Sequence, residues 1–504
     1  MATGDSTEIA EVASRHIWQL FSRHFREFIA AVIALPRDVL REYPALYLNH
    51  PSSAVALRST RPLPPSAFNS FRGENEQDEQ IAVCRALQMI ASRAGGDLIT
   101  AVTYAKLLRE LIRQERAGDT GAENSPIWFF HWQVGSTLLC AGDTGSALRE
   151  FAIARQYGEV RENIDAIRST AGREALAHAI RGSIDEAQRQ LALAESLPPL
   201  SDAFHGNALS TERTVAALIA VERMDADVDE RISALDDVAV FDVIWPFIFL
   251  ARARHQLARR RPHDALETIR ATTSAHLIQP GTLADDLITA MQIEAELVLG
   301  NVERANSIVE SSSRPGPHTR LAQIQVALHD SAYAEARRLC RAASRGPLSP
   351  EHLAQLQLLQ ASLESLEFGE VSPGLASRVA ELACSEQFRR LFTCTPASVI
   401  ELVRARLTAS EAAAFDTALA GLTFRAPMLA RPALTPAERR VLDALTLHTT
   451  TAEVADSLGV SLNTVKTQLR SVFRKLGVSS RDEAIARAAQ FSIFVRNEDE
   501  AALN

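Results

Sequence analysis

A short basic stretch near the C-terminal end is the part of this sequence best suited to chemistry. From Ser461 to Leu476 it has four basic residues and no acidic one, although the chain of 504 residues carries 62 acidic and 53 basic residues. Lys466 and Lys475, two of the three lysines in the chain, stand here. Cationic side chains without neighbouring carboxylates bind phosphates and can reach the edges of bases. The stretch therefore predicts contact with DNA, whereas the net charge of −9 alone would argue against it.

One amphipathic helix is predicted to carry these basic residues. Four apolar residues recur at spacings of four, three and four, which is the pattern of a buried helical stripe. They are Val465, Leu469, Val472 and Leu476. The other side is polar and basic, and it presents Asn463, Lys466, Thr467, Arg470 and Arg474. A polar helix face is usually only a solvated surface. The absence of acids, and the nine basic against six acidic residues over 434–496 (+3, against −12 elsewhere), favour a DNA contact.

Start and stop signals place this helix third among four short helices. A Thr or Ser followed three residues later by Glu forms a capping box, which opens a helix. Such boxes begin at Thr435, Thr450 and Ser480. Gly459 can end the second helix in the left-handed conformation, and Ala455 is small enough to let the third helix cross the second. The second and third helices thus show a helix-turn-helix pattern.

At this point a family resemblance is visible. The segment "LTPAERRVLDAL…AEVADSLGVSLNTVKTQLRSVFRKLGVSSRDEAI" resembles the LuxR-type DNA-binding domain. The matched positions are Leu434, Thr435, Glu438, Val441, Leu442, Val454, Ala455, Leu458, Ser461, Thr464, Val465, Lys466, Lys475, Leu476, Arg481, Glu483 and Ala484. The sequence departs from the family at His448, where a Gly is usual, and at Gln468, where a His is usual.

The resemblance implies roles for individual residues on double-stranded DNA. Those expected at base edges in the major groove are Lys466, Thr467 and Arg470. Those expected at the phosphate backbone are Ser461, Asn463, Thr464, Arg474 and Lys475. Similar domains pair on two-fold sites, so a homodimer on DNA is expected. The small or apolar residues of the fourth helix, Ala484, Ile485 and Ala488, are expected to form its contact.

A recurring phrase organises the middle of the chain. It occurs as "GDTGSA" (142–147), "GSIDEA" (182–187) and "GNVERA" (300–305), and more loosely at 259–265 and 329–336. Each phrase lies between two apolar helical runs, so it predicts a helical hairpin whose first helix ends at Gly. Residues 81–424 resemble a tetratricopeptide-type repeat array, and the region resembles that of MalT-like regulators. An irregular all-α domain with recurring turns is the alternative.

The predicted fold class is therefore all-α: a tetratricopeptide-like solenoid followed by a four-helix LuxR-type domain. Residues 1–80 are expected to be an irregular helical segment and a loop, with the loop over 50–80. A linker is placed at 425–433, the DNA-binding domain at 434–496 and an acidic tail at 497–504. The aromatic run "WFFHW" (128–132) is expected to pack in the core, with a ligand pocket as the sharper alternative.

Signals for catalysis, cofactors and membranes are missing from the sequence. There is no phosphate-binding G-x-x-x-x-G-K-[ST] loop, and the five cysteines form no C-x-x-C pair. We expect no enzyme activity, no cofactor, no metal and no membrane contact, in a cytoplasmic protein.

The leading hypothesis is a transcription regulator whose array binds a protein, peptide or small-molecule effector. The alternative is an interaction scaffold whose last domain dimerises, although the acid-free helix favours the first.

Overall fold

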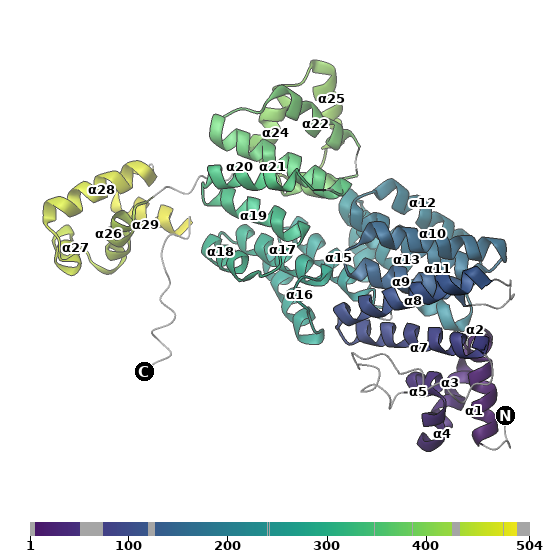
Figure 1. Ribbon diagram of the computed structural model, residues 1–504. Helices are drawn as coiled ribbons and strands as arrows, with labels where there is room; N and C mark the ends of the chain where they lie inside the picture. The colour runs from purple at the N-terminus through teal and green to yellow at the C-terminus, as the bar shows by residue number, and fades with distance from the viewer. Residues whose placement is uncertain are drawn as a thin grey trace.

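The computed structural model describes residues 6–50, 74–118, 126–238, 240, 242–346, 348–385, 387–425, 434–476 and 478–490 (Figure 1). In these ranges all regular secondary structure is α-helical, apart from an isolated bridge between Pro396 and Arg425. The predicted all-α class is confirmed. None of the helices within these ranges is long and apolar enough to cross a membrane.

Short helices form the N-terminal segment. They are α1 (Ser6–Arg15), α2 (Ile17–Arg23), α3 (Phe25–Ala34), α4 (Arg37–Glu42) and α5 (Pro44–Asn49). Trp18 and Phe21 of α2 lie 5.2 and 5.9 Å from Phe129 of α9 (Ile127–Cys140), measured between ring centroids. The same two rings lie 6.4 and 6.0 Å from Phe204 of α13 (Asp202–Arg223). Aromatic packing therefore joins this segment to the helices that follow.

The predicted loop over 50–80 is wrong for its last part, because α7 (Glu74–Ala94) already begins at Glu74. The sequence there, "ENEQDEQ", concentrates acidic residues in the first turns, where the positive end of the helix dipole favours them. Polar composition was therefore a signal for a helix start and not for a loop. Residues 51–73 of the predicted loop lie outside the described residues.

The middle of the chain consists of helices that pair with their neighbours in sequence (Figure 1). After α7 these are α8 (Leu98–Gly118), α9, α10 (Thr144–Val160), α11 (Ile164–Arg181), α12 (Ile184–Ser196), α13, α14 (Val228–Ser233), α15 (Trp245–Ala258), α16 (Pro262–Ala275), α17 (Leu283–Val298), α18 (Val302–Ser311), α19 (Pro317–His329), α20 (Tyr333–Ala343), α21 (Pro350–Phe368) and α22 (Pro373–Cys384). The odd-numbered helices of this series also pack on one another, as α11 does on α13 and α17 does on α19.

The turn inside the helix pairs repeats a backbone position. Gly142, Gly182 and Gly300 have φ of 86°, 80° and 79°, which agrees with the glycine phrases in the sequence. At the looser phrases the same left-handed position is held by Arg260 and Ser331, each with φ of 57°. Glycine lowers the energy of this conformation, but other residues can adopt it at some cost. The conformation therefore repeats more regularly than the residue type.

The last helices before the C-terminal domain are α23 (Arg389–Thr393), α24 (Ala397–Arg404) and α25 (Ala409–Ala418). Arg425, placed in the linker from the sequence, is still part of this body. Its backbone N–H donates to the carbonyl of Thr395 (3.1 Å), and its carbonyl accepts from the N–H of Ala397 (3.0 Å). Its Nη2 also donates to the carbonyl of Leu297 (2.9 Å). The rest of the predicted linker lies outside the described residues.

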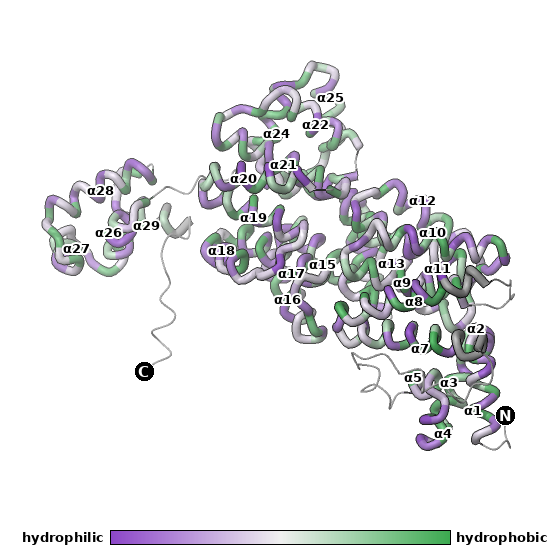
Figure 2. The backbone as a smooth tube through the Cα atoms, in the orientation of Figure 1, coloured by the Kyte–Doolittle hydropathy of each residue, from purple (hydrophilic) through white to green (hydrophobic). Residues whose placement is uncertain are grey.

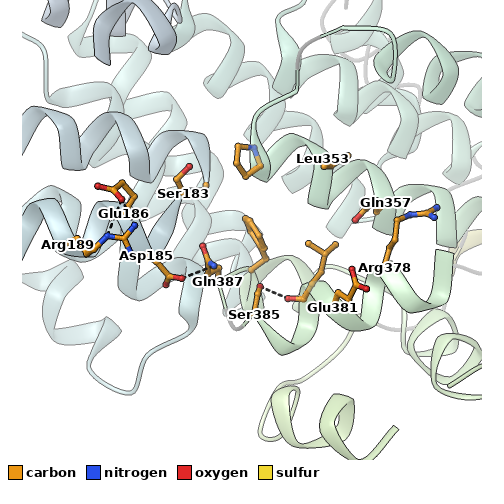
Figure 3. A pocket seen from close by; sticks show the side chains of 14 residues that line it. Ser183, Asp185, Glu186, Arg189, Leu353, Gln357, Arg378, Glu381, Ser385 and Gln387 are labelled. Atoms are coloured by element: carbon orange, nitrogen blue, oxygen red, sulfur yellow. Dashed lines mark hydrogen bonds and ion pairs between the residues drawn. The ribbon is translucent and has the colours of Figure 1, made fainter. Parts of the chain in front are cut away.

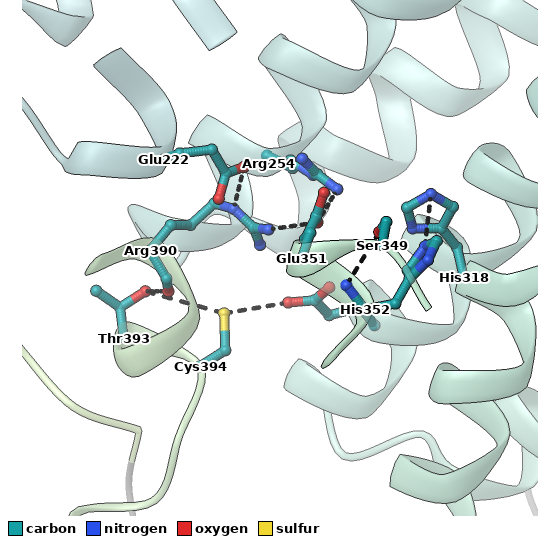
Figure 4. A network of polar contacts seen from close by, with 10 residues as sticks. Glu222, Arg254, His318, Ser349, Glu351, His352, Arg390, Thr393 and Cys394 are labelled. Atoms are coloured by element: carbon teal, nitrogen blue, oxygen red, sulfur yellow. Dashed lines mark hydrogen bonds and ion pairs between the residues drawn. The ribbon is translucent and has the colours of Figure 1, made fainter. Parts of the chain in front are cut away.

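A buried network of two arginines and two glutamates joins distant parts of this body (Figure 4). Arg390 of α23 donates through Nε to Oε1 of Glu222 in α13 (2.8 Å) and through Nη2 to Oε1 of Glu351 in α21 (3.2 Å). Arg254 of α15 bonds the same two oxygens. All four side chains are at most 5% exposed. The network thus fixes α21 and α23 against α13 and α15.

The C-terminal domain has a hydrophobic core of its own. It consists of α26 (Pro436–Leu447), α27 (Thr451–Leu458), α28 (Leu462–Leu476) and α29 (Arg481–Gln490). The boxes predicted at Thr435 and Thr450 are present, with both reciprocal hydrogen bonds. Hydrophilic and hydrophobic residues alternate along α28, as Figure 2 shows. These helices agree with the four predicted from the sequence.

Candidate nucleic-acid interface

Helix α28 has the two faces predicted from its sequence. Val465, Val472 and Leu476 are at most 3% exposed, and Leu469 is half-buried. The polar face is exposed along its length, at Asn463, Lys466, Thr467, Arg470 and Arg474. The apolar stripe is held by α26 and α27, which both pack on α28. The basic face is therefore presented by a packed helix and not by a loop.

The turn between α27 and α28 sets the position of this face. Gly459 ends α27 with φ of 63°, and the N–H of Val460 donates to the carbonyl of Ala455 (3.1 Å). Val454 and Ala455 are buried, as the crossing of the two helices requires. The left-handed turn and the small residue predicted from the sequence are both observed, and together they form a helix-turn-helix.

Polar residues of α28 fall into two groups. The hydroxyl of Ser461 accepts from the N–H of Thr464 (3.1 Å) and lies 2.7 Å from the hydroxyl of Thr464, which caps the helix. In contrast, the side chains of Lys466 and Arg470 form no hydrogen bond or ion pair within the described parts of the chain. Their charged groups are therefore available to a ligand, and they project from neighbouring turns of one helix face.

Lys475 differs from the other basic residues of α28. Its Nζ lies 2.6 Å from Oε2 of Glu438, and the side chains are 29% and 5% exposed, respectively. The same carboxylate oxygen accepts from the N–H of Thr435 (2.7 Å) at the start of α26. Lys475 thus ties the end of α28 to the capping box of α26. The sequence showed the box but not this partner, and a phosphate contact by Lys475 stays a prediction.

The Lys475–Glu438 pair gives the domain a predicted acid sensitivity. Burial alone would raise the pKa of Glu438, but hydrogen bonds from Lys475, Thr435 and Ser471 outweigh it and hold this pKa at about 2, against an ordinary value of 4.5. A carboxyl whose pKa is lower in the folded chain stabilises the fold above pH 4.5, and this contribution is lost as the pH falls from 4.5 towards 2.

We therefore expect Lys475→Met to shift acid unfolding of the domain to higher pH, because Glu438 would protonate more readily. Circular dichroism of residues 434–490 between neutral pH and pH 2 measures this shift. Arg474→Met is the matched control, since Arg474 is exposed and next in sequence. Identical acid transitions for Lys475→Met and the parent domain would contradict the role of the pair.

A second contact that could not be predicted from the sequence gives a structural role to Arg481, one of the positions that match the LuxR-type domain. The guanidinium of Arg481 donates to the backbone carbonyls of Leu445, His448 and Thr449, which lie at and just after the end of α26. His448 itself has φ of −121° and ψ of 143°, which is ordinary extended backbone. The usual Gly is therefore not required at this position, and the departure leaves the fold intact.

The residues expected to pair two copies are mostly buried. Ala484 and Ala488 of α29 are 0% exposed and belong to the core of their own domain. This corrects the sequence interpretation, because a side chain without exposed area cannot contact a second copy. Only Ile485 of the expected set is half-exposed. Dimerisation itself stays a prediction.

The charge and shape of the site suit duplex DNA. The major groove of B-DNA is wide enough to admit one α-helix, and exposed Lys and Arg can contact both base edges and phosphates there. Within the described ranges, no three His, Cys, Asp or Glu side chains gather where they could hold a metal ion. The exposed chemistry of α28 is thus cationic and hydrogen-bonding.

These features define a helix-turn-helix domain of the DNA-binding type. Residues 432–488 match the sequence model of the bacterial regulatory proteins of the luxR family. The chain is similar there to the spore germination protein GerE of Bacillus subtilis (strain 168), with 38% identity over 55 residues that cover 11% of this chain and 74% of that protein. Through its C-terminal domain the chain belongs to the luxR family, which indicates a DNA-binding transcription regulator.

Proposed function

We propose that this protein is a transcription regulator in which a helical array controls DNA binding by the C-terminal domain. The observation that carries the proposal is the exposed, acid-free face of α28, on which Lys466 and Arg470 have no partner among the described residues. A surface helix without such a task would be expected to carry acids as well, since acids outnumber bases in this chain.

Within this proposal the polar residues at and along α28 contact two different parts of the DNA. Lys466, Thr467 and Arg470 read base edges, because they lie on one exposed face. Ser461, Asn463, Thr464 and Arg474 contact the phosphate backbone and set the register. A homodimer on a two-fold site would use a surface that includes Ile485.

The proposed regulatory part is the body built from α7 to α25. Its paired helices, with a left-handed residue repeated in the turns, support a tetratricopeptide-like solenoid. Such a body presents surfaces and cavities to an effector rather than catalytic groups. We infer that it is a sensor without enzyme activity and that the protein works in the cytoplasm.

A footprint of the full-length protein on DNA upstream of its own coding sequence tests the regulator role. The expected result is a protected segment that disappears when Lys466 and Arg470 are both replaced by Met. Absence of any protection, together with binding of the C-terminal domain to another protein, would instead support an interaction scaffold.

A further inference from the structure

A cavity of about 310 Å³ lies where the N-terminal segment meets the array. Aromatic side chains form much of its wall, contributed by α2, α9 and α13. They include Trp18, Phe21, Phe129, Trp132 and Phe204. Ligand pockets in proteins begin at about this volume and are lined mainly by apolar and aromatic groups with a few polar ones. The wall is therefore suited to an apolar or aromatic body.

One end of the cavity is polar. Arg93 of α7 pairs there with Asp242, at 2.6 Å between Nε and Oδ2. Nη1 and Nη2 of Arg93 also donate, to oxygens of Gln133 and to the hydroxyl of Thr137. Asp242 is the one carboxylate among the described lining residues, and its negative charge is matched by Arg93.

Arg173 of α11 lines the same end, which therefore contains two guanidiniums and one carboxylate. Its Nη2 donates to the neutral amide of Asn207 (2.8 Å), and its guanidinium carbon lies 5.4 Å from the ring centroid of Trp132. Nε and Nη1 have no hydrogen-bond acceptor among the described residues, although Arg173 is only 1% exposed. Burial and the nearby Arg93 lower the pKa of Arg173 to about 10, although Asp242 opposes this shift, so Arg173 is still charged at neutral pH. One carboxylate is thus shared by two guanidiniums.

A buried charge without a counter-ion destabilises the protein that contains it. We propose that the cavity binds a small organic carboxylate, with its apolar or aromatic body among the rings and its anionic group at the Arg173 end. The carboxylate supplies the missing negative charge and accepts hydrogen bonds from guanidinium and amide groups. Neutral ligands of the same shape lack this contribution.

Two other charged sites in the described chain are already balanced. The open groove between the start of α12 and helices α21 and α22 contains residues of both signs (Figure 3). There Glu186 pairs with Arg189, and Asp185 pairs with Arg223 and Gln387. The Arg254–Arg390 network likewise has two carboxylates for two guanidiniums. The Arg173 cavity differs because its charge is not matched.

The proposed ligand class specifies the effector of the sensor role proposed above, and it rests on that role. The cavity wall is formed by α2, α7, α9 and α13, so a bound ligand would contact both the N-terminal segment and the array. Ligand binding can still be measured separately from DNA binding. A protein that binds the acid but no DNA would retain the site and lose the regulator role. A protein that footprints on DNA but binds no acid would do the reverse.

Calorimetry on the full-length protein tests the site, with phenylacetate, 4-phenylbutyrate and octanoate as probes and their amides as neutral counterparts. We expect binding of at least one acid, with its amide weaker by about tenfold or more, as loss of charged hydrogen bonds implies. No binding at millimolar concentration, or equal binding of acid and amide, would overturn the proposal.

Variants separate a ligand role for Arg173 from a structural one. Arg173→Met should weaken the acid by about tenfold or more while leaving the ligand-free melting temperature unchanged or raised, because an unmatched buried charge is removed. Ala203→Phe, which fills the cavity from α13, should also abolish binding. Arg161→Met is the control, since Arg161 lies over Tyr157 outside the cavity. A marked loss of ligand-free stability in Arg173→Met, with acid binding kept in Ala203→Phe, would refute the site.

Discussion

Replacing Arg390 by Met is expected to lower the free energy of unfolding by about 3–5 kcal/mol, the typical result of removing one partner from a buried ion pair. Arg390 is 5% exposed and bonds Glu222 and Glu351, which come from helices far apart in the sequence. Its removal leaves two buried carboxylates with Arg254 as the remaining guanidinium of this network. Burial lowers and the two glutamates raise the pKa of Arg390, with a net rise, so the charge persists.

Urea unfolding followed by tryptophan fluorescence measures this effect. The control is Arg338→Met, which breaks an exposed pair with Glu335 and should leave the free energy of unfolding nearly unchanged, because solvent screens an exposed ion pair. A double variant, Arg390→Met with Glu222→Gln, should cost less than the sum of the single changes, because the groups share one network. Equal stabilities of Arg390→Met and Arg338→Met would show that the network does not hold the helices together.

The second large effect is expected at the DNA interface. Arg470→Ala should weaken binding to the best site by about 1–3 kcal/mol and relax the base preference at the contacted position, because Arg can bond both acceptors of a guanine. Arg474→Ala should weaken all sequences by similar factors, as loss of a phosphate contact does. Lys475 is unsuitable for this comparison, because its replacement would also disturb Glu438.

Competition between duplexes that differ by single base pairs measures the two profiles. We expect the Arg470→Ala profile to be flattened at one or two positions and the Arg474→Ala profile to keep its shape. If the two variants gave the same profile, the division between base reading and backbone contact on α28 would be wrong.

Features that depend on neighbouring positions in the chain were predictable. The stripe of Val465, Val472 and Leu476 follows from helical periodicity, and all three are buried. Thr435 and Thr450 open helices because the partner of each cap lies only three residues away. These local rules gave the helix starts and the exposed basic face of the candidate site.

Contacts between distant positions were not predictable in the same way. Lys475 and Glu438 are 37 residues apart, and Arg390 and Glu222 are 168 apart. The residues adjacent in sequence to one member of such a pair do not indicate which distant residue is its partner. Charged residues in a sequence indicate exposed positions by default, so a buried ion pair cannot be recognised from residue type.

Small and aromatic residues were ambiguous for a physical reason. Ala484 and Ala488 suggested close approach of two copies, but the same small size lets α29 pack in the core of its own domain. The run at 128–132 is predicted to be core, and Trp128, Phe130 and Trp132 are indeed buried. Phe129, Phe130 and Trp132 of the same run also line the cavity beside Arg173. Residue type indicated burial but not whether space remains beside the rings.

The salt dependence of DNA binding by the full-length protein tests the central claim most directly. Fluorescence anisotropy with a labelled duplex should show affinity that falls with salt, with a slope of log K against log salt of about −2 to −3 or steeper, as three exposed cations imply. Those cations are Lys466, Arg470 and Arg474. The variant with Lys466 and Arg470 replaced by Met should bind weakly at low salt and show a shallower slope. Equal binding by this variant and the parent, or no binding by the parent at low salt, would contradict the assignment of α28 as the DNA-binding helix.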